Sequence, residues 1–488
     1  MSDQQILTIL HTNDIHSHFE QMAKIATFVR RERQGKTGEE TLLLDIGDHM
    51  DRMRVETEGT GGLANVEVLN ATGYEAVVLG NNEGLTYTPQ QLAQAYADPI
   101  SFQIIGSNMV RSGDGKRPAW LKPYAIIGKG EMSIGLIGVT AAFSDFYRLI
   151  DWHVTDPLAA VAECVTRLRG QVDFIVVMSH LGIKHDRMMA EQIPGIDLIL
   201  GGHTHHLFDK AERIGQTYVC AAGKFGHHVG KVVIEFDRLS RRCRVLEAGC
   251  VPVDDLPPHE GIESLIRGRK TEAERNLNET VAELACDLSA KTDEESSLGN
   301  LLAAALRKWT KADLGLVNAG QFTAPLAAGP VTRGMLHRIC PSPINPCRIT
   351  LTGAGLLRAL EEALLPEFTQ LEIRGFGFRG KTLGTLCIDG MEIMFNPNNF
   401  PYDKIVQVTV NGEPLDAERT YNVGTIDMFT FGIGYQTLKE GADVQYYLPE
   451  FIRDLVRMEL QDGDQVRRSL QRRWHRSGAE EHDRRNDE

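Results

Sequence analysis

The sequence has few cysteines, and they are not arranged in pairs. Eight cysteines occur among 488 residues, and no two of them form a CxxC motif. A chain of this length can bury a hydrophobic core of its own, so it does not need a disulfide framework. We therefore expect reduced thiols that serve mostly structural purposes.

Long apolar runs are also missing. No window approaches the roughly 20 apolar residues that a transmembrane helix needs. The first five residues carry no basic group, and the apolar run at residues 6–10 is too short for the core of a signal peptide. These absences argue against a membrane partner and lead us to expect a cytoplasmic protein.

Basic residues do not dominate the charge. Lysine and arginine total 52 against 66 aspartate and glutamate residues, which gives a formal net charge of -14. Such a chain is poorly suited to non-specific binding of nucleic acid, so no nucleic-acid polymer is expected as a partner. The contents of 42% hydrophobic and 24% charged residues exclude wholesale disorder as well as collagen-like and coiled-coil architectures.

What the sequence does have is an alternation of strand-like and helix-like segments over residues 1–255. Continuous runs rich in Ile, Val and Leu fit strands that are buried on both faces. The strand-like runs are residues 5–11, 41–46, 76–79, 133–139, 174–179 and 198–200, and helical stretches include residues 21–33 and 63–72. This pattern predicts a layered α/β architecture with buried sheets.

A second α/β region follows a joint in the chain. Residues 254–258 are charged and rich in turn formers, and residues 260–276 have a polar, helical character that could bridge two domains. Beyond the joint, Ser296 and Ser297 are candidates to cap a helix over residues 298–310.

Further strands are expected at residues 314–317 and 405–410, whereas residues 472–488 are almost all charged and lack periodicity. The predicted organisation is a first domain over residues 1–255, a linker helix at 256–280, a second domain at 281–465 and a charged, disordered tail at 466–488.

Polar side chains follow the strand-like runs of the first domain. Five runs end in Asp, Asn or His with glycine alongside, and loops at strand ends are where such folds place ligand sites. The residues concerned are Asp14, His16, Asp48, Asn81, His180, His203 and His205. Most are weak signals alone, but two histidines flanking one residue after a Gly-Gly turn favour a ligand role.

The seven side chains together predict a metal site. Imidazoles, carboxylates and an amide oxygen suit Mn²⁺, Fe²⁺, Co²⁺, Ni²⁺ or Zn²⁺. Seven ligands are too many for one tetrahedral ion and about right for two divalent ions that share a bridging aspartate. Two ions about 3.5–4 Å apart can activate a water and stabilise charge on a phosphoryl group.

The order of these motifs resembles that of the calcineurin-like metallophosphoesterases. D-x-H, G-D, G-N, a strand ending in Ser-His and G-G-H-T-H follow one another, and the opening L-H-T-N-D-I-H is similar to the 5'-nucleotidase branch. S-L-G-N-L at residues 297–301 and L-V-N-A-G at residues 316–320 resemble the C-terminal domain of that branch. The resemblance covers roughly residues 5–450.

The resemblance implies a fold, a site and a reaction. The expected fold is α/β, with an N-terminal four-layer α/β/β/α metallophosphoesterase domain and a C-terminal α/β 5'-nucleotidase-type substrate domain. A bridging water would lose a proton and attack phosphorus in line. Asp14, His16 and His205 would bind one metal, Asn81, His180 and His203 the other, and Asp48 would bridge the two.

The chain departs from the family after the asparagine ligand. The usual G-N-H-E-F-D is replaced by G-N-N-E-G-L, so that Asn82 stands at the position of the family's histidine. Asparagine cannot donate a proton at neutral pH, although it can donate a hydrogen bond to a phosphoryl oxygen. Either His18 or His49 serves as the acid, or the substrate has a good leaving group, or the domain mainly binds its ligand.

The second domain departs as well. The family motif after Asn-Ala-Gly continues with Gly-Ile-Arg, whereas this chain has Gln-Phe-Thr, and nearby arginines could compensate. Aromatic residues in Gly-rich segments are candidates for a clamp on a nucleotide base. The candidate substrate-binding residues are Asn318, Gly320, Arg333, Arg338, Phe376, Phe378, Arg379 and Phe431.

The sequence thus predicts a two-domain, two-metal phosphoesterase with its site in the cleft between the domains. Its substrates would be nucleotides or related small phosphoesters, and it would be a monomer or a homodimer. Cyclic-nucleotide phosphodiesterase or nucleotide-sugar pyrophosphohydrolase activity is the enzymatic alternative. A nucleotide-binding sensor with little turnover is the alternative outside enzymes.

Overall fold

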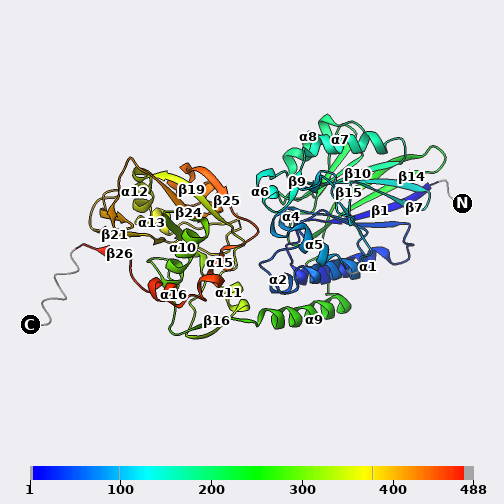
Figure 1. Cartoon of the computed structure of the whole chain (residues 1–488). Helices are drawn as coiled ribbons and strands as arrows, with labels where there is room; N and C mark the ends of the chain where they lie inside the picture. Colours follow the sequence, from blue (N-terminus) through cyan, green and yellow to red (C-terminus); the bar gives the residue numbers. More distant parts are fainter. Residues whose placement is uncertain (1–3, 98, 376, 478–488) are drawn as a thin grey trace, which may run out of the picture. The chain divides into compact units, whose positions relative to one another are not determined.

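The computed structural model describes residues 4–97, 99–375 and 377–477. The chain separates into two compact units, residues 1–276 and 277–488 (Figure 1). In the described part of the chain, no helix has the length and apolar character needed to cross a bilayer. All eight cysteines lie in described residues, and each is a free thiol, as expected from their spacing.

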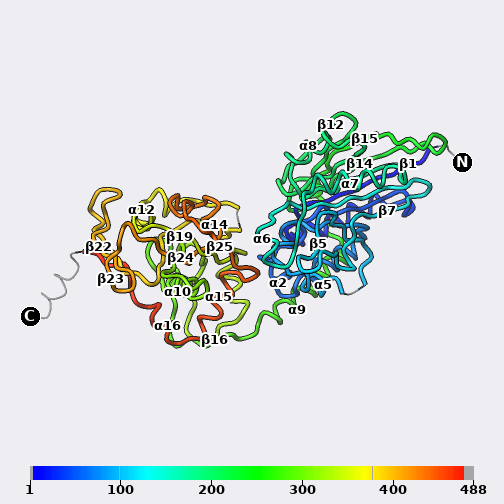
Figure 2. The backbone as a smooth tube through the Cα atoms, turned by 45° about the horizontal axis from the view of Figure 1, so that its top comes forward, coloured from blue at the N-terminus to red at the C-terminus, as the bar shows by residue number. Residues whose placement is uncertain are grey.

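Unit 1 contains two large sheets. The first has the strand order β15-β14-β1-β2-β3-β4-β6, with β1 to β4 parallel and β1 antiparallel to β14. Its strands are β1 (Gln4–Thr12), β2 (Thr41–Asp45), β3 (Ala76–Val78), β4 (Gln103–Ile105), β6 (Leu121–Lys122), β14 (His228–Asp237) and β15 (Arg242–Pro252). Figure 2 shows β1 beside β14 and β15.

The second sheet has the order β12-β13-β11-β10-β8-β7, and its four central strands are parallel. Its strands are β7 (Ala125–Lys129), β8 (Met132–Thr140), β10 (Phe174–His180), β11 (Leu198–Gly201), β12 (Glu212–Ile214) and β13 (Thr217–Ala221). A smaller antiparallel pair joins β5 (Met109–Arg111) to β9 (Trp152–Val154).

Helices cover the paired sheets on both sides. Figure 1 shows α7 and α8 on one side and α1 on the other. The helices of unit 1 are α1 (Phe19–Arg33), α2 (Val55–Thr60), α3 (Leu63–Thr72), α4 (Asn81–Thr86), α5 (Pro89–Ala95), α6 (Ser144–Leu149), α7 (Pro157–Leu168), α8 (Ile183–Gln192) and α9 (Glu260–Leu277). The order helix, sheet, sheet, helix agrees with the predicted four layers.

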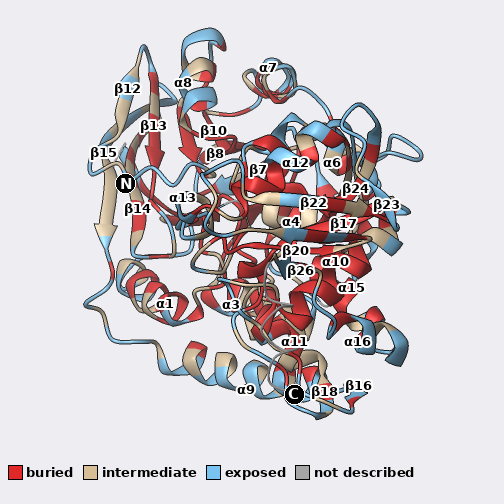
Figure 3. Cartoon of the chain, turned by 90° about the vertical axis from the view of Figure 1, so that its left-hand side faces the viewer, coloured by how far each residue is buried: buried red, intermediate tan, exposed pale blue. Residues whose placement is uncertain are grey.

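Two apolar cores hold these layers together. One lies between the sheets and includes Leu44 of β2, Val176 of β10 and Ile234 of β14. The other packs Val161 of α7 and Met189 of α8 on the far face of the second sheet. Figure 3 shows burial along β8 and β10, which explains why these parallel strands read as continuous apolar runs rather than as alternating ones.

Helix α9 corresponds to the predicted linker helix, but it is packed on unit 1. Ala273 is fully buried, Arg269 pairs with Glu67 of α3, and Asn276 Nδ2 donates to the carbonyl of Gly59 at 3.0 Å. The boundary between the units therefore falls at residues 276 and 277, after most of the helix, rather than at both of its ends.

Unit 2 is built around helix α10 (Ser297–Thr310), which begins one residue before the predicted segment. Ser296 caps it by accepting a hydrogen bond from Gly299 N at 3.2 Å. Its central sheet has the order β20-β17-β24-β19-β25. These strands are β17 (Leu314–Asn318), β19 (Pro346–Thr352), β20 (Leu386–Asp389), β24 (Thr420–Ile426) and β25 (Ala442–Tyr446).

A second sheet of unit 2 has the order β23-β22-β21-β26, and β16 pairs with β18. The strands are β16 (Thr280–Leu284), β18 (Gly329–Thr332), β21 (Met391–Phe395), β22 (Ile405–Val410), β23 (Glu413–Pro414) and β26 (Trp474–Arg476). The α-helices are α11 (Arg333–Ile339), α12 (Gly353–Glu362), α13 (Pro366–Thr369), α14 (Asp427–Thr430), α15 (Ile452–Glu459) and α16 (Gly463–Ser469), and short 3₁₀ turns are Ala319–Gln321 and Thr437–Glu440.

The end of unit 2 corrects the prediction of a disordered tail from residue 466. Residues 466–477 are ordered, because α16 extends to Ser469 and β26 pairs with β21. Trp474 packs into the core of the unit, and its Nε1 donates to the carbonyl of Leu386 at 3.0 Å. In the sequence, charged residues surround Trp474, and their high density led to the prediction of disorder. The rest of the predicted tail, residues 478–488, lies outside the described residues.

Candidate metal centre

The carboxyl ends of β1, β2, β3, β10 and β11 deliver the seven predicted ligands to one region of unit 1. The loops after β1 and β2 are joined by backbone hydrogen bonds from Asp14 N to Gly47 O at 2.9 Å and from His16 N to Asp48 O at 2.8 Å. The loop after β11 joins them, because His203 N donates to the Asp14 carboxylate at 3.0 Å. The parallel strand order thus brings residues from distant parts of the sequence together.

Several ligand positions have a strained backbone. Five have a positive φ, namely Asp14 (52°), His16 (48°), Asp48 (51°), His203 (73°) and His205 (57°). The left-handed region costs a non-glycine residue about 1 kcal/mol or more. Concentration of this strain in the loops that carry the predicted ligands fits a site whose side chains are aimed at a common point.

One group of donors contains Asp14, His16 and His205. Their donor atoms all lie within 4.8 Å of one another. Asp14 Oδ1 is 3.4 Å from His205 Nε2 and 3.9 Å from His16 Nε2, and the two imidazole Nε2 atoms are 3.4 Å apart. The residues assigned to the first metal by resemblance therefore converge.

The second group contains Asp14, Asp48 and His180, also within 4.8 Å of one another. Asp48 presents Oδ1 to His180 Nε2 at 3.3 Å and Oδ2 to His16 Nε2 at 3.9 Å. One carboxylate thus faces ligands from both predicted sites, as a bridging residue would. Beside this group, Asn81 Oδ1 lies 2.8 Å from His203 Nδ1.

The donor atoms fit a bound cation. His180 Nδ1 donates to the carbonyl of Ile46 at 2.8 Å, so the neutral ring presents a lone pair on Nε2. This Nε2 is buried, makes no hydrogen bond within the described residues and faces a carboxylate oxygen. Two acceptors that face each other need a proton or a cation between them, and the donor set is one that divalent transition metals accept.

The direction of the His180 pKa shift also indicates that this place favours a positive charge. Burial by itself lowers the pKa of His180, but the nearby Asp48 carboxylate raises it to about 10. A proton on this imidazole can occupy the place that a cation would take. Burial lowers the pKa of His16 and of His203, which favours the neutral imidazole that a metal requires.

The proton-donor candidates are placed very differently. His49 is buried, accepts a hydrogen bond from Asn65 Nδ2 at 3.1 Å, and has its pKa lowered to about 3 by burial. It is therefore neutral near pH 7 and unsuited to donate a proton, which corrects the expectation for this residue. His18 is half-buried, bonds Glu20 Oε1 at 3.0 Å, and packs against Phe225 with ring centroids 4.3 Å apart and the ring planes tilted by 31°.

Asn82, which replaces the family's histidine, contacts the metal ligands directly. Its backbone N–H donates to Asp48 Oδ1 at 2.7 Å. Its side-chain Nδ2 lies 2.9 Å from His16 Nδ1 and 3.0 Å from the carbonyl oxygen of Met50. The amide donors are thus engaged with the protein in this structure.

Glu83 is a site residue that the sequence analysis did not single out. Its carboxylate accepts hydrogen bonds from three backbone N–H groups, those of Asp48 at 3.1 Å, Met50 at 2.7 Å and Gly80 at 2.8 Å. The buried side chain therefore joins the loops that carry Asp48 and Asn81. Glu83 keeps the glutamate of the family motif although the residues on either side of it differ from that motif. This could have identified it as a site residue from the sequence.

Only some of the predicted substrate-binding residues of unit 2 have side chains that are exposed and could contact a ligand. Asn318 is buried, donates from Nδ2 to Leu383 O at 2.8 Å, and accepts from Gln321 Nε2 at 2.8 Å. A side chain on Gly320 would collide with the carbonyl oxygen of Thr382. Both residues shape the turn after β17, and their assignment as substrate contacts stays a prediction.

The prediction of an aromatic clamp on a nucleotide base is corrected at Phe378. Phe378 is 3% exposed within the core of unit 2 and cannot stack on a ligand, whereas Phe431 is 43% exposed and stacks on Tyr446. Phe376 lies outside the described residues.

Two of the predicted arginines of unit 2, Arg333 and Arg338, lie on α11, whereas Arg379 lies in a different segment. Arg333 pairs with Glu279 at 3.4 Å, and Arg338 is exposed on α11. Arg379 is half-buried and donates from its backbone N–H to Ser342 Oγ at 3.1 Å.

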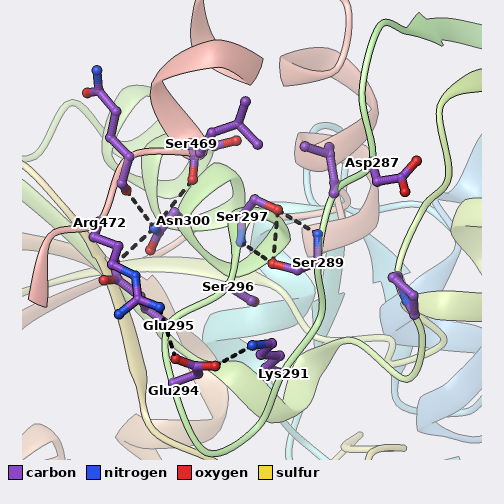
Figure 4. A pocket seen from close by; sticks show the side chains of 14 residues that line it. Asp287, Ser289, Lys291, Glu294, Glu295, Ser296, Ser297, Asn300, Ser469 and Arg472 are labelled. Atoms are coloured by element: carbon purple, nitrogen blue, oxygen red, sulfur yellow. Dashed lines mark hydrogen bonds and ion pairs between the residues drawn. The ribbon is translucent and has the colours of Figure 1, made fainter.

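A separate cavity of about 410 Å³ lies beside the start of α10 (Figure 4). Its polar groups bond mainly to one another. The backbone N–H of Ser289 donates to Ser297 Oγ at 2.6 Å, and Asn300 Nδ2 donates to Glu295 and to the carbonyl of Ser469. These bonds tie the C-terminal segment to α10, and none of the predicted site residues lines the cavity.

Two family models match the chain. The model described as Calcineurin-like phosphoesterase matches residues 7–207, and the model described as 5'-nucleotidase, C-terminal domain, matches residues 277–440. The chain is 40% identical over 461 residues to the uncharacterized metallophosphoesterase YunD of Bacillus subtilis, which covers 93% of this chain and 99% of the relative.

Solved structures share the architecture. The NAD nucleotidase of Haemophilus influenzae has a TM-score of 0.68 at 18% identity and covers 98% of each chain. The 5'-nucleotidase precursor of Thermus thermophilus has a TM-score of 0.58 at 23% identity and covers 97% of this chain and 99% of that one. The predicted combination of a metallophosphoesterase fold with a 5'-nucleotidase-type second domain is confirmed.

Proposed function

We propose that this chain, which belongs to the calcineurin-like metallophosphoesterases of the 5'-nucleotidase type, hydrolyses phosphoesters of nucleotides or closely related small molecules. The observation that carries the proposal is the convergence of two donor groups in which Asp48 faces both His180 and His16. The match of residues 277–440 to the C-terminal domain of 5'-nucleotidases supports a nucleotide as substrate.

The resemblance to the family implies which residues would hold two divalent ions, with Asp14, His16 and His205 on one ion, Asn81, His180 and His203 on the other, and Asp48 shared. The donor groups of Asp14, His16 and His205 and of Asp14, Asp48 and His180 support this assignment in part. When bound, such ions supply Lewis acidity that activates a water and offsets negative charge on the phosphoryl group. Mn²⁺, Zn²⁺, Fe²⁺, Co²⁺ and Ni²⁺ are all compatible with these donors.

The protein's own groups act on the leaving oxygen. His18 is the better placed of the two predicted proton donors, because it remains half-buried in a metal loop while His49 is enclosed. The hydrogen bond to His18 lowers the pKa of Glu20 to about 2, so the imidazole is oriented by an ionised carboxylate. We assign to His18 the donation of a hydrogen bond to the leaving oxygen.

The experiment is a panel of phosphoesters assayed with Mn²⁺, Mg²⁺, Co²⁺ and Zn²⁺. A nucleoside monophosphate, a bis-aryl phosphate, a cyclic nucleotide and a nucleotide-sugar separate monoesterase from diesterase and pyrophosphohydrolase activity. Asp48→Asn should abolish turnover, whereas the matched change Asp114→Asn, at an exposed turn, should not. Full activity after chelation and in Asp48→Asn would refute the proposal.

A diester or pyrophosphate substrate is the second candidate, and one observation favours it. Asn82 engages His16 and Met50, so this position supplies no proton for a poor leaving group. Substrates with good leaving groups depend less on such a donor. If instead nucleotides bind tightly and no metal in the panel supports turnover, the chain is a nucleotide-binding sensor.

A further inference from the structure

The imidazole of His16 is held on the side away from the metal donors. Asn82 Nδ2 lies 2.9 Å from its Nδ1, and Asp51 Oδ2 lies 3.7 Å from the same nitrogen. The opposite nitrogen, Nε2, faces Asp14 and Asp48, each at 3.9 Å. Neither Asp51 nor Asn82 is among the residues that form the two donor groups.

Both partners of Nδ1 are themselves fixed. Asn82 lies in the first turn of α4 and also donates to Met50 O at 3.0 Å. Asp51 is 4% exposed, and its Oδ1 accepts a hydrogen bond from Met53 N at 2.8 Å. The backbone N–H of Asp51 donates to Ser17 Oγ at 2.8 Å, which ties this residue to the loop that carries His16. Neither side chain can leave the imidazole without breaking another hydrogen bond.

We propose that Asp51 is a positioning residue that serves as acceptor for the Nδ1 proton of His16 and so presents an unprotonated Nε2 to a metal, whereas Asn82 holds the ring in the opposite tautomer of the metal-free protein. The proposal rests on the proposed function and deepens it. It means that the asparagine at the family's histidine position bonds a predicted metal ligand in this chain, in the tautomer that does not bind a metal. Outer partners of this kind fix the ring orientation and the tautomer of a ligating histidine.

The chemistry explains why a donor and an acceptor stand at the same nitrogen. The Asn82 amide donates to Nδ1 when the ring proton is on Nε2, pointing at the carboxylates of Asp14 and Asp48. A ligating Nε2 carries no proton, so the neutral ring then has its proton on Nδ1, where the Asp51 carboxylate is the nearby acceptor. Asp51 therefore supports the tautomer that binds a metal, and Asn82 supports the tautomer of the metal-free ring.

The test measures Mn²⁺ binding to the full-length protein by isothermal titration calorimetry and by electron paramagnetic resonance. Wild type should bind two Mn²⁺ ions with a spin-coupled spectrum. Asp51→Leu should weaken one of the two sites by about 10- to 100-fold and convert the spectrum to that of isolated Mn²⁺, whereas Asn82→Ala, which removes the donor to Nδ1, should keep both sites. His16→Ala should lose the site that Asp51→Leu weakens, which identifies it.

Conservative variants separate positioning from general loosening of the fold. Asp51→Asn keeps an acceptor oxygen and should retain the coupled spectrum, and Asp114→Leu should match wild type. Circular dichroism checks folding, and if Asn82→Ala does not fold, Asn82→Asp replaces it, because its carboxylate offers Nδ1 an acceptor in place of a donor and should likewise keep both sites. Two wild-type sites in Asp51→Leu, or the loss of one site in the folded Asn82 variant, would overturn this inference alone, whereas a wild type that binds no Mn²⁺ would overturn the proposed function with it.

Discussion

Glu83 accepts a hydrogen bond from the backbone N–H of Asp48, with 3.1 Å between Oε2 and N. The same carboxylate accepts from Met50 and Gly80, so one buried side chain links the loop after β2 to the loop after β3. Asp48 is therefore held through its main chain while its side-chain oxygens remain directed at His180 and His16.

Glu83→Gln should destabilise the metal-free protein. An amide keeps one acceptor oxygen but turns a donor toward a backbone N–H, so we expect a loss of about 2–3 kcal/mol in the free energy of unfolding. Urea unfolding followed by fluorescence measures this loss. Glu274→Gln, at an exposed position of α9, is the matched control, and an equal midpoint for both variants would contradict the role given to Glu83.

His18 and His49 should give opposite phenotypes. His18→Gln should lower kcat about 10²- to 10⁴-fold on a nucleoside monophosphate, whose leaving oxygen is basic, and much less on an aryl phosphate. His49→Gln should keep the ratio of the two rates, because His49 is enclosed by Asn65 and does not reach substrate. Steady-state kinetics on both substrates decide it, and a leaving-group effect confined to His49→Gln would reverse the assignment.

Phe431 and Phe378 should separate binding from stability. Phe431 is exposed, so Phe431→Ala should raise KM for a nucleotide about fivefold or more while leaving a substrate without a base unaffected. Phe378 is in the core, so Phe378→Ala should instead lower the free energy of unfolding by about 3–5 kcal/mol. An unchanged nucleotide KM in Phe431→Ala would remove this residue from the substrate site.

Asp427 should make stability depend on pH. Burial raises its pKa from 3.8 to about 7. Because the folded pKa lies above the unfolded one, the folded state holds the proton more tightly, and stability falls as pH rises from about 4 to about 7. Above that range the full penalty remains, at about 1.4 kcal/mol for each pKa unit.

Asp427→Asn should therefore match wild type near pH 4 and exceed it in Tm near pH 8. The difference between the two proteins isolates this group from the other buried acids and histidines. Differential scanning calorimetry at several pH values measures it, with the exposed Asp403→Asn as control. A difference that does not grow with pH would show that Asp427 is not the responsible carboxyl.

Much of the architecture followed from local sequence. The strand at residues 405–410 coincides with β22, and the helix expected at 298–310 is α10 with one added residue. These elements were accessible because apolar periodicity and a serine cap act over a few residues. The metal ligands were accessible for a related reason, since parallel strands end at one edge of a sheet and each short motif marks such an end.

The details of the site depended on contacts between distant residues. The same phenylalanine in a Gly-rich segment can be a ligand contact or a core residue, and only packing across unit 2 placed Phe378 inside and Phe431 outside. Trp474 likewise orders the segment up to residue 477. Its strand, β26, pairs with β21, and its indole N–H donates to the carbonyl of Leu386.

Asn82 illustrates the division most directly. Its identity in the motif showed that the family's proton donor is absent, which is a property of one residue. Its engagement of His16 and Met50 comes from loops 66 and 32 residues away in sequence. A side-chain hydrogen bond between residues so far apart in sequence depends on how the strands are ordered in the sheet. The sequence alone therefore determined which functional group stands at position 82. The tertiary structure decided which residues that group contacts.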